Sequence, residues 1–113
     1  MSVSTHVLDV SRGMPAQGVP VAVMVVRGTG SGGKAGVASW ITDADGRAGP
    51  HTGIAEGAVC ELVFDLRSYF SRAGVVRAFF DVVTIRFRVP EPRARCHVPL
   101  LVTPWSYTTY RGS

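Results

Sequence analysis

Apolar and polar residues alternate along several stretches of the chain. The clearest stretch spans residues 82–89, where valine, isoleucine and phenylalanine hold every second position and mostly threonine and arginine hold the positions between. Residues 58–66 and 96–102 also carry an apolar residue at every second position. A two-residue period is typical of a β-strand that buries one face and exposes the other. The pattern therefore predicts several strands, each with one core-facing side.

One further run, residues 18–27, is apolar on both parities rather than on one. A strand of an antiparallel sandwich normally leaves one face in water, so a second apolar face predicts that something covers it. A subunit interface is the simplest cover. The alternative is a central strand that the chain's own loops cover.

Turn-forming residues separate these runs, most clearly at positions 11–15, 45–46 and 90–92. The only helix expected is short, at residues 67–73, and ends at Gly74. Several short strands with little helix predict an all-β fold, a two-sheet antiparallel β-sandwich with one short helix. The length of 113 residues suits a single domain over 1–113.

Hydrophobic residues make up 46% of the chain and charged residues 18%, which predicts a buried core rather than disorder. The net charge of +4 comes from basic residues that are nearly all arginines. These arginines are scattered and share no motif, so we expect no nucleic-acid partner. No run of 18 apolar residues exists, which predicts no membrane span. Without a secretory signal we expect a cytoplasmic protein, with Cys60 and Cys96 as buried thiols rather than a disulfide.

The glycine-rich stretch at residues 28–33 fits the dinucleotide-binding pattern G-x-G-x-x-G. That motif requires a helix to begin there, so that its first turn holds the pyrophosphate. Residues 35–41 read instead as a strand, and Ala35 stands where a P-loop carries the hydroxyl that binds magnesium. We therefore interpret the stretch as a hairpin loop.

Residues 42–47, Thr-Asp-Ala-Asp-Gly-Arg, begin like a calcium loop, but the closing glutamate is replaced by Thr52. The Asp-Gly pair predicts a tight turn, which leaves Arg47 just beyond it. Of the three histidines, His51 is expected in a loop, whereas His6 and His97 fall on strands. No spacing among them matches a metal site, and an isolated histidine is more often structural than catalytic.

Six segments occur in an order that matches one known pattern. They are Ser-Thr-His-Val-Leu-Asp at 4–9, Gly-Val-Pro-Val at 18–21, Thr-Asp-Ala-Asp-Gly-Arg at 42–47, Glu-Leu-Val-Phe-Asp at 61–65, His-Val-Pro-Leu-Leu at 97–101 and Tyr-Arg-Gly-Ser at 110–113. The chain resembles the 5-hydroxyisourate hydrolases, transthyretin-like enzymes of urate degradation. The Tyr-Arg-Gly-Ser ending separates these hydrolases from transthyretin proper, a hormone carrier of the same fold.

The resemblance implies functional residues at the positions that match its motifs. The implied catalytic residues are His6, Arg47, His97 and Ser113, and the implied substrate-binding residues are His6, Arg47, Tyr110 and Arg111. Two positions depart from the family: Arg95 stands where a histidine is frequent, and Trp105-Ser106 stands where Phe-Gly or Tyr-Gly is frequent. Neither departure touches an implied site residue.

The resemblance also implies a sandwich of transthyretin type, assembled as a homotetramer with its sites at the dimer–dimer interface and without metal or cofactor. The implied reaction converts 5-hydroxyisourate to 2-oxo-4-hydroxy-4-carboxy-5-ureidoimidazoline. Histidine suits proton transfer near neutral pH, so one of His6 and His97 would activate water, with the assignment open. The role of Ser113, through its hydroxyl or a terminal carboxylate, is also open. The alternative is a non-catalytic transthyretin-like protein that binds a small ligand.

Overall fold

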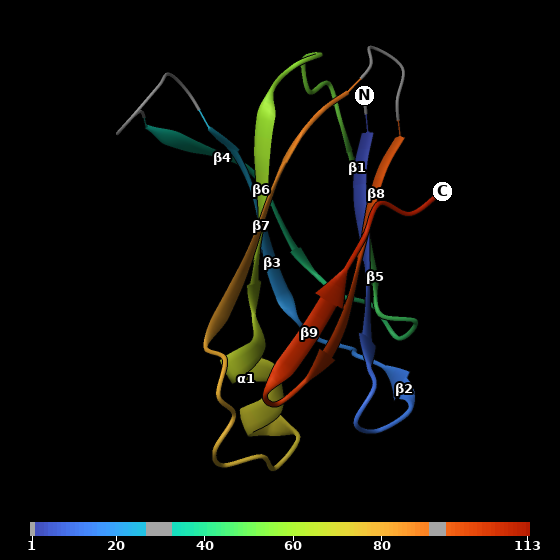
Figure 1. Cartoon of the computed structure of the whole chain (residues 1–113), viewed down its shortest axis with the longest axis vertical. Helices are drawn as coiled ribbons and strands as arrows, with labels where there is room; N and C mark the ends of the chain where they lie inside the picture. Colours follow the sequence, from blue (N-terminus) through green and yellow to red (C-terminus); the bar gives the residue numbers. More distant parts are fainter. Residues whose placement is uncertain (1, 27–32, 91–94) are drawn as a thin grey trace.

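Two β-sheets pack face to face, with a short helix at one end (Figure 1). The computed structural model describes residues 2–26, 33–90 and 95–113. Its elements are β1 (Ser2–Asp9), β2 (Met14–Pro15), β3 (Pro20–Val26), β4 (Lys34–Ile41), β5 (Arg47–Thr52), β6 (Val59–Asp65), α1 (Leu66–Arg72), β7 (Val82–Arg88), β8 (Arg95–Thr103) and β9 (Ser106–Thr109). The predicted all-β, two-sheet fold with one short helix is confirmed.

The first sheet has the order β2-β1-β8-β9, with β5 also paired to β1, and the second has the order β4-β3-β6-β7. The prediction of wholly antiparallel sheets is wrong at one pair, because β1 and β8 run parallel from Ser2 opposite Arg95 to Asp9 opposite Val102. They lie side by side in Figure 1. Alternation along a strand reports which face is buried and says nothing of the partner's direction.

The core fills the space between the sheets, and both sheets contribute to it. Leu62 and Phe64 of β6 and Leu100 of β8 are fully buried on the parities that the alternation predicts. Cys60 and Cys96 also lie in this core as free thiols, as predicted, and burial raises the pKa of both. Residues on the other parity of β1 and β8 therefore point away from the core, onto the outer face of their sheet.

The short helix α1 closes one end of the sandwich. Asp65 caps its start, because the Asp65 carboxylate accepts a hydrogen bond from the Ser68 amide at 3.0 Å and so satisfies a free N–H of the first turn. Tyr69 is buried, and its hydroxyl donates to the buried carboxylate of Asp9 on β1 at 2.7 Å. Burial, the largest cause, and Asp9 raise the pKa of Tyr69 to about 12, so the phenol keeps its proton. The helix therefore ties the second sheet to β1.

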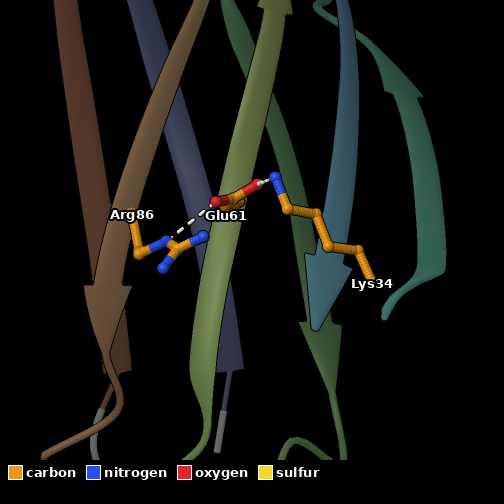
Figure 2. Close-up of polar contacts among 3 residues, drawn as sticks. All are labelled: Lys34, Glu61 and Arg86. Atoms are coloured by element: carbon orange, nitrogen blue, oxygen red, sulfur yellow. Dashed lines mark hydrogen bonds and ion pairs between the residues drawn. The ribbon is translucent and has the colours of Figure 1, made fainter. Parts of the chain in front are cut away.

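The strand that is apolar on both parities, β3, lies between β4 and β6 at the centre of its sheet. Its Ala22 and Met24 on the outer face are half-buried. Beside them the nearly buried Glu61 pairs through both oxygens, with Lys34 Nζ at 2.8 Å and Arg86 Nε at 2.8 Å (Figure 2). The side chains of Lys34 and Arg86 cover part of the outer face of β3. This favours the alternative in which β3 is a central strand covered by its own chain rather than by a second subunit.

Residues 27–32, which include most of the predicted hairpin loop, lie outside the described residues. Strands β3 and β4 pair antiparallel on either side of this loop.

The Glu61 cluster predicts a pH-dependent part of the folding stability. The hydrogen bond from Lys34, helped by Arg86, lowers the pKa of Glu61 below its ordinary 4.5, although burial opposes the shift. A carboxyl with a lowered folded pKa stabilises above the unfolded pKa, and the contribution disappears as pH falls through the folded value. Because Lys34 and Arg86 are about half exposed, we expect Glu61→Gln to lower the free energy of unfolding at pH 7 by only about 1 kcal/mol.

Urea denaturation between pH 7 and pH 3 measures this effect. The difference between wild type and Glu61→Gln should shrink below pH 4.5, as the wild-type carboxyl takes up its proton. Asp81→Asn is the control, because Asp81 lies 3.9 Å from Arg67 and both side chains are exposed. A Glu61→Gln difference that stays constant down to pH 3 would contradict the ion-pair explanation.

Candidate active site

Three of the implied site residues come together on the outer face of the sheet that contains β1. The antiparallel register of β1 and β5 places His6 opposite Arg47. The parallel register of β1 and β8 places Ser4 opposite His97. Since residues two apart on a strand share a face, Ser4 and His6 present their side chains on one side of β1. Strands β5, β1 and β8 therefore bring a guanidinium and two imidazoles to one surface.

A depression of about 480 Å³ opens on this surface. Its lining residues are Ser2, Ser4, Arg47, Pro50, Thr52, Arg95, His97 and Ser113. The lining offers guanidinium, imidazole and hydroxyl groups, and no Asp or Glu side chain is among its described residues. Guanidinium groups present planar donors that match the oxygens of anionic or carbonyl-rich molecules. The chemistry of the depression therefore suits a small, oxygen-rich ligand.

The turn between β4 and β5 positions both Arg47 and His6. The Asp43 carboxylate accepts hydrogen bonds from the amides of Asp45 and Arg47, each at 2.9 Å. Gly46 has φ 77°, and a Cβ there would meet the Val7 carbonyl oxygen at 2.3 Å, so glycine is required. The predicted tight turn is confirmed, with its aspartate holding backbone amides.

His6 is held by the same turn. Its Nε2 lies 2.8 Å from the carbonyl oxygen of Asp45. A carbonyl only accepts hydrogen bonds, so Nε2 carries the proton in this contact. In a neutral His6 the acceptor nitrogen is then Nδ1. The turn thereby fixes which nitrogen of His6 is available to a ligand.

His97 is half-buried on β8, and its Nδ1 lies 2.9 Å from the Ser4 hydroxyl. Burial, followed by the charges of Arg47 and His6, lowers the pKa of His97 below its ordinary 6.5. His97 is therefore mainly neutral at pH 7 and has a free lone pair for proton transfer. Ser4 was not among the residues singled out from the sequence, because its contact with His97 depends on the β1–β8 register.

The last residues of the chain lie against His97. The amide of Gly112 donates to the His97 carbonyl oxygen at 2.7 Å, and this contact brings Ser113 to the edge of the depression. Strand β9 ends at Thr109, and beyond it a single bridge joins Gly112 to His97. Gly112 leaves no room for a side chain, since a Cβ would lie 2.7 Å from His97 Cδ2. The tail thus docks through glycine backbone rather than through a strand.

Tyr110 and Arg111 do not line this depression in the single chain. Both are exposed and line a different, mainly apolar hollow of about 330 Å³, beside Phe87 and Cys96. His51, predicted in a loop, belongs to β5, where it pairs with Val3. Because the register shifts between Val3 and Thr5, His51 lies across from the buried Val3, whereas Arg47 lies across from His6 on the outer face. In one chain, Arg47, His97 and Ser113 therefore line the depression, and His6 lies next to it, across from Arg47.

Within residues 2–26, 33–90 and 95–113, no three His, Cys, Asp or Glu side chains gather in a metal-binding arrangement. In the same part of the chain, no helix is long and apolar enough to cross a membrane.

The family model described as HIUase/Transthyretin family matches residues 3–112. The chain belongs to this family. A 5-hydroxyisourate hydrolase of Deinococcus radiodurans is 43% identical over 117 residues, covering 97% of this chain and 94% of the relative. The 5-hydroxyisourate hydrolase structure of Klebsiella pneumoniae is 31% identical with a TM-score of 0.82 and covers 100% of both chains. The resemblance found in the sequence motifs is confirmed.

Membership in the HIUase/Transthyretin family leaves two activities to separate. Sea bream transthyretin, solved in complex with thyroxine, is 28% identical with a TM-score of 0.82, covering 97% of this chain and 93% of that one. The same TM-score for a hydrolase and a carrier means that the backbone does not distinguish them. The side chains in the depression must do so.

Proposed function

We propose that this protein hydrolyses 5-hydroxyisourate to 2-oxo-4-hydroxy-4-carboxy-5-ureidoimidazoline in urate degradation. The observation that carries the proposal is that Arg47 and His97 line one depression, while His6 lies on the strand between them, across from Arg47. The hydrolase relative at 43% identity supports the choice of substrate. Residues 1–113 form a single hydrolase domain in this proposal.

The first step assigned to these residues is attack of water on a ring carbonyl carbon. His97 accepts the proton of the attacking water, because its lowered pKa keeps it unprotonated at neutral pH. A C–O bond forms and the carbonyl becomes an oxyanion. Arg47 stabilises this oxyanion, since its guanidinium is always charged and presents parallel donors.

The second step is cleavage of the ring C–N bond. The oxyanion collapses to a carboxylic acid, and the departing nitrogen takes the proton that His97 holds. His6 orients the substrate through its free Nδ1, since its Nε2 is engaged by Asp45. Ser113 at the edge of the depression hydrogen-bonds the substrate or its water. No cofactor takes part in this scheme.

The proposed assembly is a homotetramer with sites at the dimer–dimer interface. The depression is open on the sheet's outer face, and Tyr110 and Arg111 are exposed outside it. A second copy packed on this face would close the site, with Tyr110 and Arg111 binding substrate in the assembly. Sedimentation should give four times the chain mass of 12.0 kDa. We place the enzyme in the cytoplasm, where free cysteines such as Cys60 and Cys96 are the usual state.

The test of the proposed activity is an ultraviolet assay with freshly generated 5-hydroxyisourate, which also decays on its own. The wild-type protein should accelerate the decay, and the double variant His6→Ala/His97→Ala should not. Decay at the spontaneous rate with folded wild-type protein would overturn the proposal. That result would favour the alternative, a transthyretin-like protein that binds a small ligand without reacting with it.

A further inference from the structure

We propose that Ser4 is a positioning residue that holds His97 by accepting the Nδ1 proton, which leaves Nε2 for the reacting water. The effects of Ser4 on kcat and KM rest on the proposed function. The tautomer of His97 is measurable in the protein without substrate.

The geometry begins with the parallel pairing of β1 and β8. The register places Ser4 directly opposite His97 on the outer face, with the Ser4 oxygen 2.9 Å from Nδ1. Both residues are half-buried, so the contact is partly shielded from water. Gly112 packs against the Cδ2 edge of the same ring, where an added Cβ would lie at 2.7 Å. The imidazole is therefore held on its Nδ1 side by Ser4 and confined on its Cδ2 side by the tail.

The chemistry of proton transfer selects the direction of this hydrogen bond. A hydroxyl can donate or accept. For Nε2 to take a proton from water its lone pair must be free, so the neutral ring must carry its proton on Nδ1 and donate it to Ser4. Once Nε2 is protonated, both nitrogens of the imidazolium are donors, and Ser4 again accepts. Ser4 thus accepts the same hydrogen bond from Nδ1 before and after the proton transfer, and neither side chain has to move.

A neutral partner at Nδ1 also suits the charges around the ring. The charged and titratable side chains that act on His97 or line a hollow with it are mostly cationic, and none of the described ones is an Asp or Glu: His6, Arg47, Arg88, Arg95, Cys96, Tyr110 and Arg111. A carboxylate in place of Ser4 would favour the imidazolium and raise the pKa of His97. The serine orients the ring without adding a negative charge, so the neutral, reactive form persists near pH 7.

A second reading of the same contact is that Ser4 is a nucleophile activated by His97. Nucleophilic serine normally works with a base that a third group orients. In the described residues His97 Nδ1 has Ser4 as its hydrogen-bonding partner, and no carboxylate holds the ring's other nitrogen. The positioning role is therefore the one that the geometry favours.

The experiment compares Ser4→Ala, Ser4→Thr and Ser4→Asp in the full chain. Ser4→Ala should lower kcat/KM about tenfold to a hundredfold, the scale seen for partners that orient a functional histidine. Ser4→Thr keeps the hydroxyl and should recover activity to within about threefold of wild type. Ser4→Asp should move the acidic limb of the pH profile upward by about one pH unit or more. Ser39→Ala, an exposed serine on β4 of the other sheet, is the matched control and should match wild type.

The direct readout is the ¹⁵N NMR spectrum of His97 in the protein without substrate. Wild type should show the proton on Nδ1, and Ser4→Ala should show a mixture of tautomers or the Nε2–H form. An unchanged His97 tautomer together with unchanged kcat/KM in Ser4→Ala would overturn the proposal. Complete loss of activity in Ser4→Ala, with a covalent adduct detected by mass spectrometry in wild type, would overturn it in favour of the nucleophile. An inactive wild type with the expected tautomer shift would sink the proposed function and leave this inference standing.

Discussion

Replacing His97 with alanine should lower the turnover of 5-hydroxyisourate by roughly two to four orders of magnitude. This is the range expected for loss of a general base, and no Asp or Glu side chain is among the described residues that line the depression. His6→Ala should fall in the same range, because its Nδ1 is the nitrogen that the Asp45 contact leaves free for the substrate. Stopped-flow ultraviolet spectroscopy measures both rates against the spontaneous decay.

The control for the histidine variants is His51→Ala. His51 is half-buried on β5 and outside the depression, so this variant should turn over at close to the wild-type rate. The size of every variant must be checked by sedimentation, since loss of a tetramer would also lower activity. Near-normal turnover in His97→Ala would contradict the assignment of His97 as the base, and near-normal turnover in His6→Ala would contradict its role in orienting the substrate.

The pH profile separates the two histidines. The pKa of His97 is lowered, so its neutral, proton-accepting form grows as pH rises through a value below 6.5. Wild-type kcat/KM should therefore rise along an acidic limb whose midpoint lies below 6.5. The residual rate of His97→Ala should lack this limb, whereas His6→Ala should retain it. If the acidic limb of the pH profile is still present in His97→Ala, the general base is a group other than His97.

Arg47→Ala should lower kcat by about a hundredfold to a thousandfold, the cost of removing one donor to a developing oxyanion. Arg47→Lys keeps the positive charge and loses the planar fork, so it should recover only part of the rate. Separate measurement of kcat and KM is essential, because stabilisation of the transition state appears in kcat. If Arg47→Ala changes only KM, Arg47 binds the substrate in the ground state and does not stabilise the oxyanion.

The matched control for Arg47 is Arg67→Ala. Arg67 is exposed at the start of α1 and lies 3.9 Å from the equally exposed Asp81. Its removal changes the net charge of the chain by the same amount as Arg47→Ala. A comparable loss of kcat in Arg67→Ala would mean that long-range charge, rather than the position of the guanidinium in the depression, accounts for the effect.

Much of the fold was predictable because a strand buried on one face shows alternating apolar and polar residues in its own sequence. The alternation at residues 58–66, 82–89 and 96–102 identified the core-facing sides of β6, β7 and β8. The parallel pairing of β1 and β8 was not predictable in this way. Both strands carry the same two-residue period that they would carry in an antiparallel pair, and only the path of the whole chain decides between them.

The candidate site was predictable where a residue belongs to a motif and unpredictable where it depends on register. The motifs pointed to His6, Arg47 and His97, and the structure groups them. Ser4 belongs to the same segment as His6, but only the strand pairing shows that it faces His97. The matched motif also implied Tyr110 and Arg111, but these residues lie beyond the end of β9 at Thr109 and line a different hollow in the single chain.

The β1–β8 pairing also governs when the protein acquires its activity. Ser4 and His97 are separated by 93 residues, so their contact is among the last that a growing polypeptide is able to make. While the chain leaves the ribosome, β1 has only β2 and β5 to pair with, and one edge of it stays open until β8 is synthesised. Long-range pairings of this kind fold slowly and leave unpaired strand edges that attract other chains. The proposed active site therefore forms only after β8 has paired with β1, and until then one edge of β1 is open to other chains.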